Sequence, residues 1–272
     1  MKPKTVYLTV NGVKLKILLR RGNNPNIILL HGMPGQMSNW KHVLRLLETK
    51  NYTVVVPDMR GYGGSEKPEE VSIDDYVEDL RGIMESLDLD PFMTLVAGHS
   101  FGCVVAMEYI VKHNDIPATL LVGPPYELKM DLMDKIIVHT PHLFWKPLFF
   151  KNNPLTRRFY RKMFFSPKTP YKIFQDFMKD NTEYIESLPA HVFRYSRFFD
   201  GWRAPEKLRE ARVKAEIIVG RDDIITPPEA AKKINGLIPD SKLIVVEDAG
   251  HMILYEKPDV VASSIIRLVN SI

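Results

Sequence analysis

The sequence contains a single cysteine, Cys103, among its 272 residues. One thiol cannot form an intramolecular disulfide, so nothing in the sequence points to an oxidising compartment. The eight histidines are scattered, and the chain has no Cys and His clusters at the spacing of zinc ligands. We therefore expect no metal and no organic cofactor.

Long apolar runs are also missing. No run approaches the roughly 18 uncharged apolar residues that a transmembrane helix requires. The first residues, MKPKTVYLTVNGVKLKILL, alternate like a strand and carry lysines throughout, unlike the apolar stretch and cleavage site of a signal peptide. These absences predict a soluble, cytoplasmic protein without integral membrane association.

Neither sign of charge is in large excess. The chain has 37 Lys and Arg against 33 Asp and Glu, and a net charge of +4 is too small to indicate a nucleic-acid partner. Hydrophobic residues make up 45% and charged residues 26%, as in an ordinary globular protein. The length suits one large α/β domain and predicts no particular oligomeric state.

Eight segments have the pattern of β-strands. Residues 5–10 and 13–19 alternate on either side of Asn11-Gly12, which is a strong signal for a hairpin. The other six are almost continuously apolar, which is typical of parallel strands buried on both faces. These six runs are residues 26–31, 53–57, 93–97, 118–122, 215–219 and 242–247.

Helical periodicity fills most of the intervals between these strands. The segments concerned are residues 38–49, 72–87, 101–113, 228–237 and 257–270. Alternating strands and helices predict an α/β fold, with a mostly parallel eight-stranded sheet, helices on both faces and an antiparallel pair at one edge.

The alternation breaks between about residues 125 and 205. This stretch holds eleven of the thirteen phenylalanines, Phe149 among them. It also carries 14 Lys and Arg against 8 Asp and Glu, a net charge of +6, whereas the remainder has 23 against 25. We interpret residues 125–205 as a helical lid inserted into a core made of residues 1–124 and 206–272.

The sequence Gly98-His99-Ser100-Phe101-Gly102 follows a buried strand and opens a helix. This is the G-x-S-x-G pattern in the strand–turn–helix setting that exposes a nucleophilic serine. Small flanking residues permit the tight turn, so we identify Ser100 as the candidate nucleophile.

A serine hydroxyl is a weak nucleophile and needs a neighbouring base, which an acid orients. In this setting the acid and then the histidine follow the serine along the chain. Asp222 and Asp223 both follow a buried strand and are rivals for the acid. His251, after Gly250, is the one histidine beyond them and is the candidate base.

The loop His31-Gly32-Met33-Pro34-Gly35 directly follows another strand. In such sites one oxyanion-binding N–H comes from this loop and the other from the residue after the nucleophile. We therefore expect the backbone N–H groups of Met33 and Phe101 to form an oxyanion hole. His31 itself is interpreted as a structural, hydrogen-bonded residue.

Over essentially its whole length the chain resembles the α/β-hydrolase superfamily. The residues that carry the resemblance are HGMPG (31–35), DMRGYGGS (58–65), GHSFG (98–102), GRDDIITP (220–227) and GH (250–251). The spacing usual in that family implies Asp223, rather than Asp222, as the acid.

Differences within the motifs argue against particular groups of enzymes that share this fold. Epoxide hydrolases and haloalkane dehalogenases of this fold use an aspartate nucleophile, and Ser100 argues against both. HGMPG and DMRG depart from the HGGPG and DQRG of proline iminopeptidases, whose lid supplies carboxylates to the substrate's amino group, whereas this lid is net basic. Cys103 is interpreted as a small, inert packing residue.

The resemblance implies a serine carboxylesterase that works through an acyl-enzyme. Some of the lid phenylalanines are expected to line an apolar pocket over Ser100, which favours small-molecule esters with apolar acyl or aromatic portions. The same site also suits a C–C bond hydrolase, a lactonase, a cofactor-free haloperoxidase, a proline-iminopeptidase-like enzyme or a slow-turnover ligand receptor. The cluster Arg157, Arg158, Arg161 and Lys162 could be a solvated face or could meet an acidic substrate tail or a lipid surface.

Overall fold

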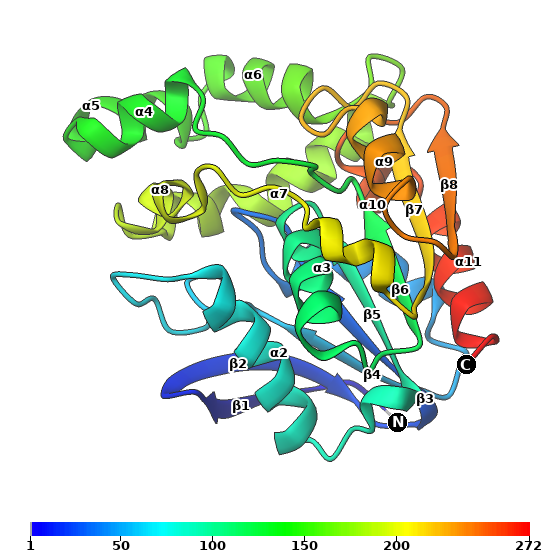
Figure 1. The fold of residues 1–272 in the computed structure, drawn as a ribbon. Coiled ribbons are helices and arrows are strands. Elements are labelled where there is room, and N and C mark those ends of the chain that lie inside the picture. The colour runs from blue at the N-terminus through cyan, green and yellow to red at the C-terminus, as the bar shows by residue number, and fades with distance from the viewer. Residues whose placement is uncertain (1) are drawn as a thin grey trace.

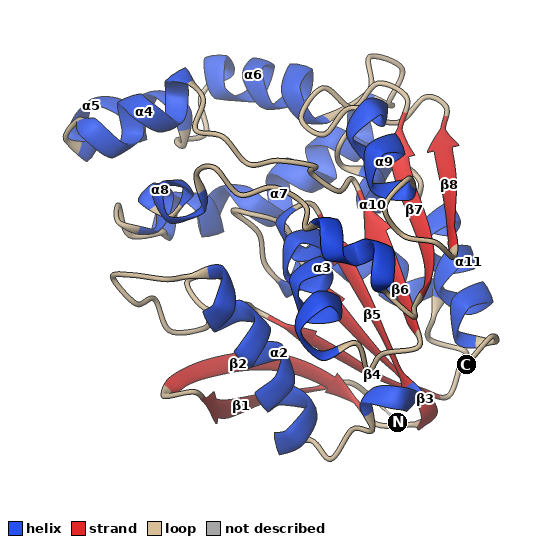
Figure 2. Ribbon diagram, in the orientation of Figure 1, coloured by secondary structure: helices blue, strands red, loops and turns tan. Residues whose placement is uncertain are grey.

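A computed structural model describes residues 2–272, except for the side chains of Leu148 and Phe149, so the predicted role of Phe149 lies outside the described residues. A single eight-stranded sheet crosses the centre of the molecule (Figures 1 and 2). Its strands are β1 (Lys4–Val10), β2 (Val13–Arg20), β3 (Asn23–Leu30), β4 (Tyr52–Pro57), β5 (Thr94–His99), β6 (Ala118–Val122), β7 (Lys214–Gly220) and β8 (Ser241–Val246).

The strands lie in the order β1-β2-β4-β3-β5-β6-β7-β8. β1 pairs antiparallel with β2 and β2 pairs antiparallel with β4, while all the remaining neighbours are parallel. Asn11 and Gly12 have φ of 48° and 75°, which fits the tight turn between β1 and β2. The predicted mostly parallel sheet with an antiparallel edge is confirmed.

Burial follows the position of each strand in the sheet. β5 and β6 are buried along their whole length, as an almost continuous apolar run predicts. The same prediction was wrong for residues 242–247, because β8 is an edge strand and Leu243–Val246 are only half-buried. An edge strand with one neighbour leaves part of its apolar surface outside the core.

Helices cover both faces of the sheet (Figures 1 and 2). On one face lie α2 (Ile73–Ser86), α3 (Phe101–His113) and α9 (Pro228–Asn235), and on the other lie α1 (Lys41–Leu46) and α11 (Pro258–Val269). The short α10 (Ile253–Glu256) leads into α11. Short 3-10 turns are η1 (Met37–Trp40), η2 (Pro91–Met93), η3 (Val192–Arg194) and η4 (Glu206–Glu210).

Between β6 and β7 the described chain contains helices and no strand of the sheet. These inserted helices are α4 (Leu132–His139), α5 (His142–Phe149), α6 (Pro154–Phe164), α7 (Tyr171–Ser187) and α8 (Ser196–Phe199). They lie beyond the ends of the strands, and α5, α4 and α6 lie from left to right along the top of Figure 1. An isolated antiparallel bridge joins Glu127 to Arg203 where the chain leaves and re-enters the sheet region. The division at residues 125 and 205 stays a prediction.

No helix in the described part of the chain combines the length and the apolar character needed to span a membrane.

Candidate active site

Ser100 occupies a strained turn between β5 and α3. Its φ is 52° and its ψ is −114°, a backbone conformation that residues other than glycine rarely adopt. The turn is fixed on both sides, because the Ser100 N–H donates to the Val122 carbonyl at 2.9 Å and the Ser100 carbonyl accepts the Cys103 N–H at 2.9 Å. The side chain of Ser100 lines a cavity above the sheet.

The glycines on either side of Ser100 allow this turn. A Cβ atom added to Gly98 would lie 2.4 Å from the backbone carbon of Gly102, and one added to Gly102 would lie 2.5 Å from the carbonyl oxygen of Leu30. The end of β5, the start of α3 and the end of β3 therefore approach too closely for any larger residue.

Asp223 and His251 lie together at the ends of β7 and β8. The Nδ1 atom of His251 is 2.8 Å from Oδ2 of Asp223, and the two side chains are only 6% and 0% exposed. Asp222, the rival for this position, instead accepts a hydrogen bond from Oγ of Ser166 at 2.5 Å. Of the two neighbouring acids, the structure brings Asp223 to the histidine.

The pKa of Asp223 lies below its ordinary value. Burial alone would raise it, but the His251 ring and hydrogen bonds from Thr226 stabilise the ionised carboxylate more strongly. An ionised Asp223 accepts the Nδ1 proton of a neutral His251, which leaves Nε2 of that ring without a proton.

Thr226 also contacts this pair, and sequence reasoning missed it, because its place three residues after Asp223 was the one signal that could have found it. Its Oγ1 lies 2.9 Å from Oδ2 of Asp223, 3.1 Å from Nδ1 of His251 and 3.1 Å from the Gly123 carbonyl. Its backbone N–H donates to the other carboxylate oxygen at 2.9 Å. Thr226 thereby fixes the carboxylate relative to the ring.

Glu256 is a second buried residue that sequence reasoning missed. It accepts the N–H of Gly250 at 2.8 Å, the N–H of Ser166 at 2.8 Å and the hydroxyl proton of Thr169. Burial raises the pKa of Glu256, and these hydrogen bonds oppose the rise without cancelling it. The carboxylate ties the residue before His251 to the connection between α6 and α7.

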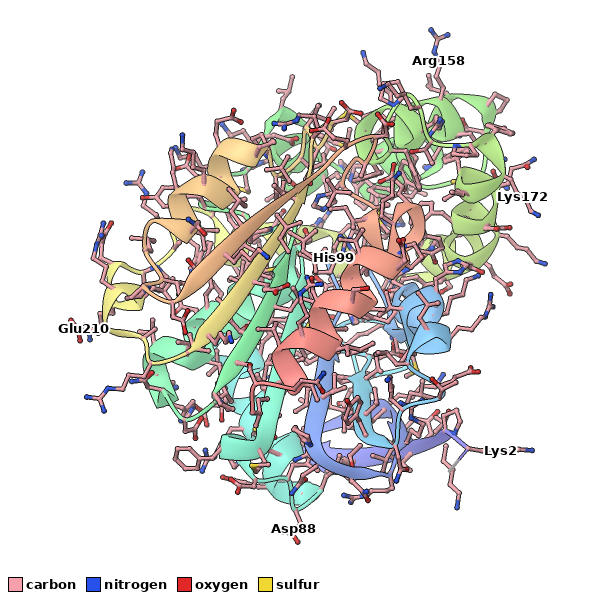
Figure 3. All side chains as sticks on the ribbon, turned by 90° about the vertical axis from the view of Figure 1, so that its right-hand side faces the viewer. Lys2, Asp88, His99, Arg158, Lys172 and Glu210 are labelled. Carbon is pink, nitrogen blue, oxygen red and sulfur yellow. The ribbon has the colours of Figure 1, made fainter. Side chains whose placement is uncertain are left out.

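His99 lies beside His251 and was not singled out in the sequence. Its Nε2 donates to the His251 carbonyl at 2.9 Å. Burial, followed by the neighbouring His251, lowers the pKa of His99 to about 3, so the ring stays neutral. Figure 3 places His99 in the interior, between the sheet and α11.

The loop of residues 31–35 packs against Ser100. A Cβ atom added to Gly32 would lie 3.1 Å from Cβ of Ser100. His31 holds the loop, because its Nδ1 donates to the Gly32 carbonyl at 2.7 Å and its Nε2 accepts the Met59 N–H at 3.0 Å. Within residues 2–272 the N–H groups of Met33 and Phe101 have no hydrogen-bond acceptor, so both are free to bind an oxygen atom.

A cavity of about 270 Å³ joins these residues to the inserted helices. Ser100, His251 and Met33 lie on its core side. Its other wall is largely apolar and includes Phe150, Phe159, Phe164, Phe177 and Phe193. Five of the lid phenylalanines thus line the cavity, whereas others, such as Phe174, are buried in packing and Phe144 is exposed.

The cavity has acidic side chains but no lysine or arginine among the described residues that line it. The acids are Asp131 and Asp134, at the start of α4, and each accepts the backbone N–H of the other. Arg157, Arg158, Arg161 and Lys162 do not line the cavity, so this cluster does not meet a substrate tail there. Among residues 2–272 no group of three or more His, Cys, Asp or Glu side chains could hold a metal ion.

Comparison with known proteins agrees with this architecture. A family model described as "alpha/beta hydrolase fold" matches residues 25–258. The AB hydrolase superfamily protein YisY of Bacillus subtilis is 26% identical over 92% of this chain and 93% of its own length. A proline iminopeptidase of Saccharolobus solfataricus is 26% identical over 93% of this chain and 88% of its own length.

Among solved structures, an esterase (EaEST) from Exiguobacterium antarcticum superimposes with a TM-score of 0.83. The match covers 98% of this chain and 100% of the esterase at 17% sequence identity. At this identity the likeness shows the fold alone.

The contacts of Gly102 predict that Gly102→Ala destabilises the fold. The added Cβ would meet backbone rather than a movable side chain, so we expect the free energy of unfolding to fall by about 2–3 kcal/mol. Denaturant unfolding measures this. Gly236→Ala is the matched control, because its Cβ would come no closer than 3.4 Å to the Lys233 carbonyl, and its effect should stay within about 0.5 kcal/mol. A Gly102→Ala protein as stable as the wild type would contradict the close approach.

The hydrogen bonds of Glu256 predict that Glu256→Gln also destabilises the protein. The amide keeps one acceptor but turns an NH₂ group toward a backbone N–H, so we expect a loss of about 1–3 kcal/mol in denaturant unfolding. Glu210→Gln, at the exposed edge of the molecule in Figure 3, should change stability by less than about 0.5 kcal/mol. Equal effects of the two substitutions would remove the special role of Glu256.

Proposed function

Because the chain belongs to the α/β-hydrolase family, we propose that it is a serine hydrolase that cleaves carboxylic esters of apolar acyl or aromatic compounds. One observation carries the proposal. Ser100, on its strained turn, shares a cavity with His251, whose Nδ1 is hydrogen-bonded to the buried Asp223. These are the nucleophile, the base and the acid that acyl transfer requires.

In the proposed mechanism Oγ of Ser100 attacks the ester carbonyl carbon and gives its proton to Nε2 of His251. Asp223 stabilises the resulting imidazolium. The N–H groups of Met33 and Phe101 bind the negative oxygen of the tetrahedral intermediate, and each such donor typically contributes about 3 kcal/mol to transition-state stabilisation. The imidazolium then protonates the leaving alcohol as the C–O bond breaks, which gives an acyl-enzyme.

Water completes the reaction by the same route. His251 takes a proton from the water molecule as its oxygen attacks the acyl carbon, and the proton returns to Oγ of Ser100 as the acid leaves. The net change is one ester and one water converted into one acid and one alcohol. Thr226 and Glu256 do not exchange protons in this scheme; they hold Asp223 and the His251 loop in place.

The cavity supports a substrate of modest size without a negative charge. Its 270 Å³ lies just below the range of about 300–1,000 Å³ usual for small-molecule sites, and its aromatic wall suits an apolar acyl or aromatic group. A carboxylate bound there would face Asp134 with no lysine or arginine to offset the repulsion.

A proline-iminopeptidase-like activity is the second candidate. The net positive charge of residues 125–205 argued against it, but the cations stand outside the cavity while Asp131 and Asp134 line it. Two acids beside an acyl-transfer site could receive a substrate's amino group. The relative from Saccharolobus solfataricus bears the name of this activity.

The esterase proposal predicts hydrolysis of p-nitrophenyl esters from acetate to dodecanoate, with an optimum at the chain length that fills the cavity. Ser100→Ala should abolish turnover, and Asp223→Asn should lower kcat by a factor on the order of 10³–10⁴ because the ring loses its orienting charge. Since the pKa of Asp223 is depressed, this carboxylate should stay ionised to a lower pH than an ordinary aspartate, so its contribution to activity should be lost only as the pH falls below that of an ordinary aspartate.

Steady-state kinetics across pH provides the test. A single burst without turnover would instead favour a slow-turnover receptor. Faster cleavage of a prolyl amide than of any ester would favour the second candidate.

The acidic lining predicts discrimination by substrate charge. We expect kcat/KM for p-nitrophenyl hexanoate to be at least about tenfold higher than kcat/KM for the corresponding ester with a terminal carboxylate. Asp134→Asn, which keeps an oxygen for the Asp131 N–H, should lower this ratio of kcat/KM values. Asp176→Asn, outside the cavity on α7, should leave it unchanged. Equal rates for both substrates would show that Asp134 does not act on the bound acyl group.

A further inference from the structure

Helices α4 and α6 each present two different faces. On α4, Met133 and Ile137 line the cavity, while Leu132, Lys135 and Ile136 are exposed at the spacing of one helical stripe. α6 repeats the arrangement. Phe159 and Met163 line the cavity, and Leu155, Arg158 and Lys162 are exposed on the other side.

The outer face of α4, α5 and α6, defined by the exposed residues of these helices, is unusually apolar. It carries five of the eleven large hydrophobic side chains that are exposed in the described part of the chain. These five are Leu132, Ile136, Leu143, Phe144 and Leu155. Leu143 and Phe144, adjacent on α5, are 73% and 74% exposed. Exposed apolar side chains gathered in one region mark an interaction surface.

The same region holds the positive charge of the inserted segment. Residues 132–162 contain seven Lys and Arg but one acid, Asp134, a net charge of +6. Within residues 2–272 none of these seven cations forms a salt bridge. On the core, Lys112 and Arg221 are paired with acids, whereas Lys207 and Lys232 are exposed without a salt bridge to any described residue and serve as a comparison for the cations of this region. Figure 3 shows Arg158 pointing outward from the top of the molecule.

We propose that the outer face of α4, α5 and α6 docks on the surface of an anionic lipid bilayer. Exposed apolar side chains on short helices enter the headgroup boundary, and lysines and arginines beside them meet the lipid phosphates. This surface offers both kinds of group, and none of its cations forms a salt bridge within the described part of the chain. Docking of this kind is peripheral and needs no spanning helix.

Charge argues against the other occupants of this face. Two copies of the chain meeting through it would bring two regions of +6 together, which is unfavourable. A nucleic acid would meet the cations but leave Leu143 and Phe144 without an apolar partner. A lipid surface is the occupant that offers partners to both the cations and the exposed apolar side chains of this face.

Docking would hold the cavity close to the lipid. The inner faces of α4 and α6 line the cavity, so one helix diameter, about 10 Å, separates it from the proposed surface. An apolar substrate dissolved in the bilayer would then have a short path to the site. Membrane docking itself does not depend on the proposed esterase activity.

Co-sedimentation with vesicles tests the proposal without interference from hydrolysis if the lipids are ether-linked. We expect the wild-type protein to bind vesicles of phosphatidylcholine containing about one third phosphatidylglycerol at least tenfold more tightly than pure phosphatidylcholine. High salt should weaken binding to the anionic vesicles. Failure to bind anionic vesicles at low salt would overturn the proposal.

Paired variants separate the surface from general effects. Leu143→Ser with Phe144→Ser, and Arg158→Gln with Lys162→Gln, should each weaken binding at least tenfold while the thermal unfolding temperature stays unchanged. Phe92→Ser, on a side chain 67% exposed on the core, and Lys207→Gln with Lys232→Gln should not weaken it. Equal losses of vesicle binding in the surface variants and in the control variants would overturn the proposal. A concentration-dependent dimer abolished by the Leu143 and Phe144 changes would assign the face to a second copy instead.

Discussion

The close approach of three backbone segments around Ser100 is the constraint on which the rest of the site depends. The end of β3, the end of β5 and the start of α3 meet through Gly98 and Gly102, with no room for a side chain. A non-glycine residue at positive φ stores strain of about 1–3 kcal/mol, which the surrounding structure must hold. Here the surroundings are β5 and β6, buried along their whole length, and α3, most of which is buried. Phe101, the first residue of α3, has an N–H without an acceptor among the described residues, and the preceding Ser100 packs against Gly32 of the loop that carries Met33.

Polar contacts at the ends of β7 and β8 connect this turn to the inserted helices. Thr226 spans Asp223, His251 and the Gly123 carbonyl, so the loop after β7 is fixed against the end of β6. Glu256 holds Gly250 on one side and Ser166 on the other. The histidine loop and the connection between α6 and α7 thus share one buried carboxylate, and a displacement of either would disturb the other.

Sequence patterns predicted the elements that local residue order determines. Helix 101–113 and strand 118–122 have the predicted bounds, because a G-x-S-x-G turn and a run of buried apolar residues are each defined over a few positions. Other features depend on contacts between distant residues. Asp222 and Asp223 are neighbours with the same chemistry, and only the position of Ser166, far away in the sequence, separates their partners. Glu256 had no local signal, since its three donors come from two other segments. The exposure of β8 likewise follows from its place at the sheet edge, which an apolar run does not reveal.

The net charge of residues 125–205 led to a wrong expectation for the cavity for a related reason. It adds up charges on helix faces that the fold keeps apart. Residues 125–205 carry +6, which suggests a basic environment for a substrate. Helical geometry divides that charge, because each residue of a helix is turned by about 100° from the one before it, so residues four positions apart lie close together while neighbours point to different sides. On α6 this puts Arg158 and Lys162 outside and Phe159 and Met163 inside, and on α4 it puts Lys135 outside and Asp134 inside. The cavity therefore meets its ligand with apolar and acidic groups while the outer surface presents cations and exposed leucine and phenylalanine. The proposed selection of uncharged substrates and the proposed docking on an anionic surface therefore do not compete, because different residues of the same turns serve each of them.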